Sequence, residues 1–145
     1  MSCCDIFEKF NVDNNLVKEY EYWQLLVKKN QGYFGSCVAI TKKHHELLGD
    51  LSPEEMVEYQ LVAHEVETAL KKAFNYDGIH HCLLMKKDKH THFHIVPRFI
   101  ADKTFAGTTW CDGYGPFIPG TTKEVTQEVL NQIRDEIKLK IHEAE

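Results

Sequence analysis

The sequence lacks the features that mark membrane-spanning and secreted proteins. No apolar run approaches the roughly 20 residues needed to cross a bilayer. The first eight residues have neither the basic start nor the apolar stretch of a signal peptide. The five cysteines show no Cys-x-x-Cys spacing, so reduced thiols are expected. These features predict a cytoplasmic protein with no membrane partner.

Basic residues are in the minority, with 17 Lys and Arg against 22 Asp and Glu and a formal net charge of −5. A protein that binds long nucleic acids usually carries a basic excess, so no nucleic-acid polymer is expected as a partner. The balance reverses locally, because Lys86, Lys87 and Lys89 precede a run of histidines and Arg98 follows it. This cluster indicates a confined site for a small anion, although a solvated lysine-rich turn fits the same residues.

The 145 residues, 43% of them hydrophobic, fit one domain over 1–145 with one core. Ser52-Pro53-Glu54-Glu55 has the pattern of a capping box with proline at the first helical position, and predicts a long helix over 53–74. Segregated antiparallel strands and helices then make an α+β domain. The other expected elements are a short helix within 4–11, strands over 20–27, 36–41, 79–85 and 90–99, a hairpin connection over 28–33, a tight turn over 86–89, a loop over 101–120 and an amphipathic helix within 121–144.

Three alternating histidines, His90, His92 and His94, are the strongest functional signal. On a strand they project from one face with neighbouring Cα atoms roughly 6.6–6.8 Å apart, while Phe93 and Ile95 face the other side. The imidazoles suit either a metal site or nucleophilic attack on phosphorus. The adjacent lysines disfavour a dication and favour a phosphate.

The run and its flanks resemble the histidine triad (HIT) superfamily, in particular its diadenosine polyphosphate hydrolases. The resemblance covers roughly residues 4–118. Its segments are the histidine run with Pro97-Arg98, then Lys42-Lys43-His44, Leu48, Asp50-Leu51-Ser52-Pro53-Glu54-Glu55, Phe105-Ala106-Gly107, Asp112 and Tyr114-Gly115.

The resemblance implies an antiparallel sheet of about five strands with one long central helix and a C-terminal helix, assembled as a homodimer. It also implies a nucleotide hydrolase or transferase that cleaves a nucleoside phosphate ester, anhydride or phosphoramidate bond. The expected substrate is a purine nucleotide or dinucleotide such as a dinucleoside polyphosphate. His92 would attack the α-phosphorus to form a nucleotidyl-histidine, and His90 and His94 would orient it and assist proton transfer. No cofactor and no metal are expected for this chemistry.

The sequence departs from the family pattern at several expected substrate-binding positions. Ser36 stands where many relatives have a fourth active-site histidine, eight residues before His44. Lys86 stands in a turn where relatives carry Asn, Gln or Ser, and Asn30 is the nearest substitute for a ribose-binding Asp or Asn, since Lys28 does not fit that role.

The expected substrate-binding residues are therefore Lys86, His44, Ser36, Asn30 and Arg98. The alternative is a HIT protein that binds or senses nucleotides with weak turnover. Asp5 and Glu8 occupy positions where some relatives have zinc-binding cysteines, so no structural zinc is expected.

Overall fold

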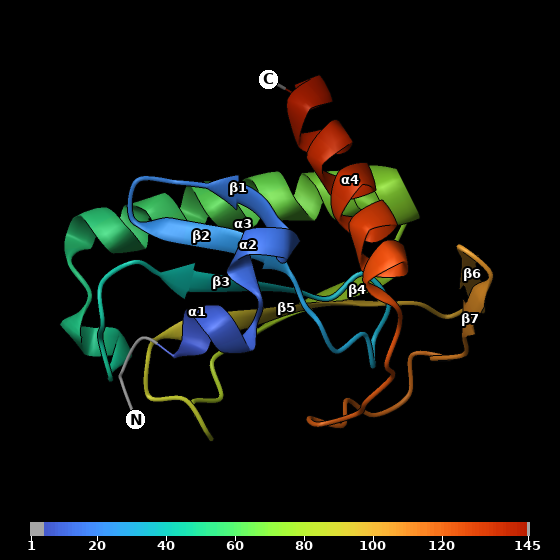
Figure 1. The fold of residues 1–145 in the computed structure, drawn as a ribbon, viewed down its shortest axis with the longest axis horizontal. Helices are drawn as coiled ribbons and strands as arrows, with labels where there is room; N and C mark the ends of the chain where they lie inside the picture. Colours follow the sequence, from blue (N-terminus) through green and yellow to red (C-terminus); the bar gives the residue numbers. More distant parts are fainter. Residues whose placement is uncertain (1–4, 145) are drawn as a thin grey trace.

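The computed structural model describes residues 5–144, which form one antiparallel sheet with helices on both faces, together with a small separate hairpin (Figure 1). The five-stranded sheet has the order β1-β2-β3-β5-β4, and β6 pairs with β7. The elements in chain order are α1 (Ile6–Lys9), α2 (Val12–Asn15), β1 (Leu16–Glu19), β2 (Trp23–Val27), β3 (Cys37–Thr41), a 3₁₀ turn (Leu48–Asp50), α3 (Pro53–Phe74), β4 (Gly78–Cys82), β5 (His92–Arg98), β6 (Lys103–Phe105), β7 (Thr108–Trp110) and α4 (Gln127–Ala144). The predicted α+β fold is confirmed.

The two faces of the sheet carry different residues because side chains alternate along each strand. The face toward α3 and α4 is apolar, with rows such as Val27, Cys37 and Ile95 in the main core. The opposite face carries His92 and His94, and α1 covers part of it. The smaller core beneath α1 contains Ile6, Phe10, Leu26, Val38 and Ile40. The sheet therefore separates the packing core from the face that holds the histidines.

The long helix is where the sequence predicted it. The Ser52 side chain accepts a hydrogen bond from the Glu55 backbone at 3.1 Å, and the Glu55 carboxylate accepts one from the Ser52 backbone at 2.8 Å. This capping box satisfies backbone donors that the first turn would otherwise leave free.

No helix within residues 5–144 is long and apolar enough to span a membrane.

Three predicted strand boundaries were wrong. Residues 20–27 are not one strand: the chain reverses at residues 20–22, where the Tyr20 amide donates to the Trp23 carbonyl at 2.8 Å, and β1 lies before the reversal. Tyr20 and Trp23 are buried and Tyr22 is partly buried through the reversal, so the composition of this segment resembled one continuous strand. The strand expected at 79–85 ends at Cys82, and the next one begins at His92 instead of His90. A long connection over 83–91 replaces the predicted tight turn.

Two further segments differ in detail. The loop expected over 101–120 contains the β6–β7 hairpin, whose three-residue strands are too short to give a clear alternating pattern. The helix expected within 121–144 begins at Gln127, and Val125 packs on the core ahead of it. Near the N-terminus, the expected short helix is α1, and α2 follows directly.

Candidate functional site

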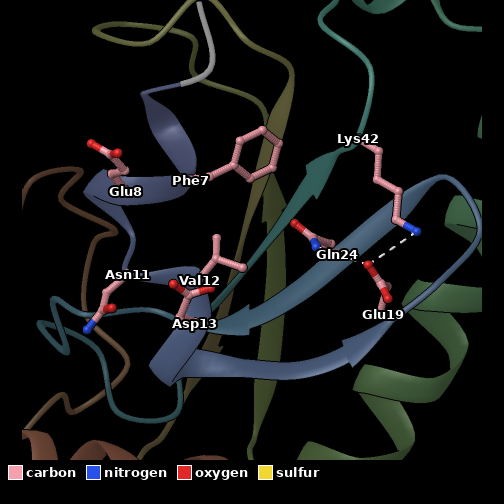
Figure 2. A pocket seen from close by; sticks show the side chains of 8 residues that line it. All are labelled: Phe7, Glu8, Asn11, Val12, Asp13, Glu19, Gln24 and Lys42. Carbon is pink, nitrogen blue, oxygen red and sulfur yellow. Dashed lines mark hydrogen bonds and ion pairs between the residues drawn. The ribbon is translucent and has the colours of Figure 1, made fainter.

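His92 and His94 line a cavity of about 380 Å³ between α1, the 83–91 connection and the segment before α4. A larger hollow of about 550 Å³ lies on the other side of α1 (Figure 2), but its lining has no histidine and no nucleophilic side chain. We therefore place the candidate site in the smaller space, here called the histidine cavity. Its lining residues are Lys9, Phe10, Lys28, Asn30, Leu84, Lys86, Lys87, Asp88, His92, His94, Pro119 and Gly120.

His92, the first residue of β5, has its proton position fixed by the backbone. Its Nδ1 lies 2.7 Å from the carbonyl oxygen of His90. A carbonyl only accepts hydrogen bonds, so Nδ1 carries the hydrogen and the lone pair of the neutral ring is on Nε2. Burial lowers the pKa of His92 below its usual value, which keeps the ring neutral at pH 7. His92 therefore offers an unprotonated nitrogen nucleophile.

His90 lies just before β5, not on it, and is almost completely buried, with 1% of its surface exposed. Its Nε2 lies 2.6 Å from the Thr41 carbonyl, and must be the donor of that hydrogen bond. Its Nδ1 lies 3.4 Å from Nδ1 of His44. The predicted proximity of His44 to the triad is thus present, through His90.

Thr91, the residue between the first two histidines, anchors the chain before β5. Its backbone amide and its hydroxyl both donate to the His45 carbonyl, at 2.8 and 2.7 Å. The His45 ring lies 2.9 Å from a carboxylate oxygen of Glu55, which also forms the α3 capping box. The backbone around His90 is consequently held by the N-terminus of the long helix.

His94, two residues further along β5, is partly buried, less so than His90 and His92, but its Nδ1 atom is enclosed. Its buried Nδ1 has no hydrogen-bond partner within the described residues. Burial, assisted by the nearby charge of Lys28, lowers its pKa to about 3. Its ring packs edge-on to His92 at 4.9 Å and to Phe10 at 6.4 Å, measured between ring centroids. His94 is therefore neutral at pH 7 in the free protein.

The cavity is strongly cationic although the whole chain is acidic. Four lysines line it, and the one lining carboxylate, Asp88, is 2.5 Å from the Lys9 amine. Lys86 and Lys87 come from the connection before β5, Lys28 follows β2, and Lys9 ends α1. This arrangement concentrates positive potential beside His92 and suits a phosphorylated ligand.

Only some of the predicted substrate-binding residues line the histidine cavity. Lys86 and Asn30 line the cavity, but the Asn30 amide donates to the Thr121 carbonyl and accepts from the Lys123 backbone, at 3.1 and 2.9 Å. Asn30 thereby holds the segment that forms one wall of the site.

Ser36 and Arg98 lie on the histidine face but are engaged by the protein itself. The Ser36 hydroxyl, beside a small adjoining space that His94 also lines, donates to the Tyr33 carbonyl at 2.6 Å. The Arg98 guanidinium is 1% exposed, and makes two 2.8 Å hydrogen bonds to the carboxylate of Asp112 and one to the Gly115 carbonyl. Arg98 fixes the 110–118 loop over the sheet.

Sequence reasoning did not select Phe10 or Lys28 as parts of the site. Phe10 sits near the rings of both His92 and His94. The Lys28 amide donates to the Ser36 carbonyl at 2.8 Å, so Lys28 continues the β2–β3 ladder beyond Leu26 and Val38. The alternation that puts the histidines on one face puts Lys28 on that same face, but only once the strand order is known.

The described residues do not bring together enough metal-binding side chains for a metal site. Within residues 5–144, no group of three or more His, Cys, Asp and Glu side chains is arranged to hold a metal ion. The close pair of His44 and His90 is a two-donor arrangement, which is fewer than the four ligands usual in a structural zinc site.

Comparison with solved structures shows a shared fold. A histidine triad nucleotide-binding protein from Sulfolobus tokodaii, described as hypothetical, is 22% identical with a TM-score of 0.71, and the match covers 99% of this chain and 93% of that one. A Hit-like protein involved in cell-cycle regulation from Bartonella henselae is 22% identical, with a TM-score of 0.72 and coverage of 97% and 98%. Plasmodium falciparum diadenosine triphosphate hydrolase is 17% identical, with a TM-score of 0.66 and coverage of 90% and 78%.

Comparison with individual curated proteins gave no match. The family comparison did: the HIT domain matches residues 9–101, a stretch that includes α2, all five strands of the main sheet and the whole histidine run. The expected resemblance is confirmed, and the chain belongs to the HIT domain family.

Proposed function

We propose that this protein is a nucleotide hydrolase or transferase that acts through a nucleotidyl-histidine intermediate on His92. The observation that carries the proposal is the 2.7 Å contact between His92 Nδ1 and the His90 carbonyl. It directs the lone pair of a neutral imidazole to Nε2 in a cavity lined by lysines. A positioned, unprotonated nitrogen beside cationic groups is what attack on a phosphate group requires.

The reaction has two displacements at one phosphorus. In the first, the Nε2 lone pair forms a P–N bond, and the bond from phosphorus to the leaving group breaks, with its electron pair going to the leaving group. In the second, a water oxygen attacks the same phosphorus, the P–N bond returns its electron pair to Nε2, and the water releases a proton. His92 Nδ1 keeps its hydrogen bond to His90 throughout, which supports the positive charge that develops on the ring.

The titration state of His94 favours an anionic leaving group. With a pKa of about 3, His94 is not a charged acid at pH 7 in the free protein, so it is poorly suited to protonate an amine. A polyphosphate leaves as an anion and is stabilised by lysines without an acid. We therefore favour dinucleoside polyphosphates over phosphoramidates as substrates. The Phe10 ring, which lines the cavity, can contact a purine base of such a substrate. The structural likeness to a diadenosine triphosphate hydrolase agrees with this choice.

The test measures release of AMP from diadenosine tetraphosphate and from adenosine 5′-phosphoramidate by the wild type and by His92→Asn. We expect turnover of the polyphosphate to fall at least about a thousandfold in the variant, because the nucleophile is lost. His64→Gln, on the exposed side of α3, is the matched control and should keep wild-type rates. Quenching with alkaline denaturant, in which the P–N bond survives, during turnover of a radiolabelled substrate should trap label on the wild-type and His64→Gln chains but not on His92→Asn.

Equal turnover by His92→Asn and the wild type would refute this assignment. Tight binding of AMP with no turnover of either compound would instead support the alternative of a nucleotide-binding HIT protein with weak activity. This alternative is motivated by the departures from the family pattern at Ser36 and Lys86; the Ser36 hydroxyl donates to the Tyr33 carbonyl.

We also propose a homodimer. β4 is an edge strand of the sheet, and an unpaired strand edge can add a strand from a second copy. Sedimentation analysis should give twice the mass of one chain, whereas a monomer at micromolar concentration would contradict the proposal. The cytoplasmic location and the single domain over 1–145 stay predictions from the sequence.

A further inference from the structure

The histidine cavity continues into a second hollow of about 500 Å³. The two spaces share four lining residues, namely Lys9, Phe10, Lys28 and Asn30. Lys28 and Phe10 therefore stand at the junction, between the space that contains His92 and a space large enough for another part of the same ligand. A bound molecule can extend from one space to the other without leaving the protein surface.

Lys28 is a half-buried cation at this junction. Its amine has no ion pair or hydrogen-bond partner among residues 5–144. Burial lowers its pKa, and the nearby charges that act on it are those of Lys9 and the Cys82 thiol, with no carboxylate among them. A charge withdrawn from water without a partner costs free energy. An anionic ligand beside the Lys28 amine would offset that cost by pairing with the charge.

The position of Lys28 separates it from the attacked phosphate. The register places Leu26, Val38 and His94 in one row, and Lys28 and Ser36 in the next. Lys28 is thus two strands from β5, about 10 Å at the usual strand spacing. Because the Lys28 side chain also lines the second hollow, it can contact a part of a ligand that lies away from the phosphate at His92.

The second hollow is lined by both polar and apolar side chains. Lys29 and Thr122 line it, and Glu124 is its one carboxylate. Lys9, the other shared lysine, is already paired with Asp88. Lys28 is consequently the cation with most to gain from an added anion.

We propose that Lys28 is the centre of a second anion site, and that the protein selects nucleotides carrying a second phosphate group apart from the one that His92 attacks. The inference rests on the proposed function for the placement of the first phosphate. Two sources offer this chemistry: a phosphate on the 2′ or 3′ position of the ribose, or the distal end of a polyphosphate chain. Lysine binds phosphate as a point charge, so it accepts either geometry.

The experiment measures dissociation constants by calorimetry for AMP, ADP, adenosine 2′,5′-bisphosphate and adenosine 3′,5′-bisphosphate. The proteins are the wild type, Lys28→Met and, as a control, Lys138→Met on the exposed side of α4. In the wild type we expect at least one doubly phosphorylated compound to bind about tenfold or more tightly than AMP. Lys28→Met should reduce that preference to less than about threefold, whereas Lys138→Met should keep it.

The compound that shows the preference identifies the source of the second phosphate. Tighter binding of a ribose bisphosphate identifies a phosphorylated ribose, and tighter binding of ADP identifies the phosphate chain. Equal affinity for AMP and all three doubly phosphorylated compounds in the wild type would overturn the proposal. So would a preference that survives in Lys28→Met, or an absence of measurable binding by any of them.

A stability measurement checks that Lys28→Met acts through ligand recognition. Methionine removes an unpaired half-buried charge, so the variant's Tm should equal or exceed that of the wild type. A lower Tm together with lost affinity for every compound, AMP included, would assign Lys28 a structural role and overturn the proposal. Because the readout is binding, a Lys28-dependent preference without His92-dependent turnover would leave this inference standing while the proposed reaction fails.

Discussion

The neutral, buried state of His94 predicts how stability depends on pH. Its folded-state pKa of about 3 lies below the ordinary value of 6.5, so the unfolded chain takes up the proton first as pH falls. Stability is therefore lost progressively from about pH 6.5 down to the folded-state pKa. Between pH 7 and pH 5 the loss from this one group is about 2 kcal/mol, which corresponds to roughly 5–8 °C in Tm for a domain of this size.

The measurement is urea unfolding at pH 7 and pH 5 for the wild type and His94→Gln, in buffers without phosphate so that no phosphate binds in the cavity. His92 also has a lowered pKa and contributes to both proteins, so the comparison isolates His94. The difference in free energy of unfolding between the two pH values should be about 2 kcal/mol smaller in the variant.

His64→Gln removes an exposed imidazole instead and tests whether loss of any histidine flattens the dependence. A difference between wild type and His94→Gln below about 0.5 kcal/mol would refute the conclusion that His94 is held neutral by burial. The same result would also count against a preference for an anionic leaving group, because that preference requires a His94 that carries no charge at pH 7.

Two further predictions concern the residues that hold the site in place. Asp112→Asn should cost about 3–5 kcal/mol in the free energy of unfolding, because it leaves the 1%-exposed guanidinium of Arg98 without its carboxylate; a loss under about 1 kcal/mol in urea unfolding would contradict this role. Ser52→Ala should cost about 1 kcal/mol by removing the side-chain cap of α3, and an unchanged Tm would show that the cap contributes nothing here.

Local signals in the sequence predicted the helices best. The α3 boundaries follow from the Ser52 capping box and the apolar spacing behind it, which act within a few residues of each other. The strands were harder because their ends depend on partners distant in the sequence. The Tyr20–Trp23 reversal is closed by a single backbone hydrogen bond, and nothing in the aromatic composition distinguishes it from a continuing strand.

The candidate site was predictable in part for the same reason. The histidines were found because they are close together in the sequence and alternate on one face. Lys28 and Phe10 reach the cavity through strand order and the packing of α1, which a single sequence does not reveal. Arg98 was grouped with the anion site by its nearness in sequence, but its partner Asp112 comes from a later loop.

The strand that was expected to begin at His90 begins at His92, and this difference bears directly on the proposed chemistry. In a regular strand the carbonyl groups lie in the plane of the sheet and the side chains stand perpendicular to it, so a carbonyl cannot accept a hydrogen bond from the side chain two residues later. The His90 carbonyl reaches His92 Nδ1 at 2.7 Å because β5 begins only at His92.

The chain just before β5 is held by the pair of hydrogen bonds from Thr91 to the His45 carbonyl. His45 is in turn held by Glu55 at the start of α3. A sequence-based rule that extends the strand to His90 would orient the three imidazoles alike, but it would leave the tautomer of His92 undetermined. The irregular start of β5 therefore supplies what alternation alone does not, a fixed proton on Nδ1 and a free lone pair on Nε2.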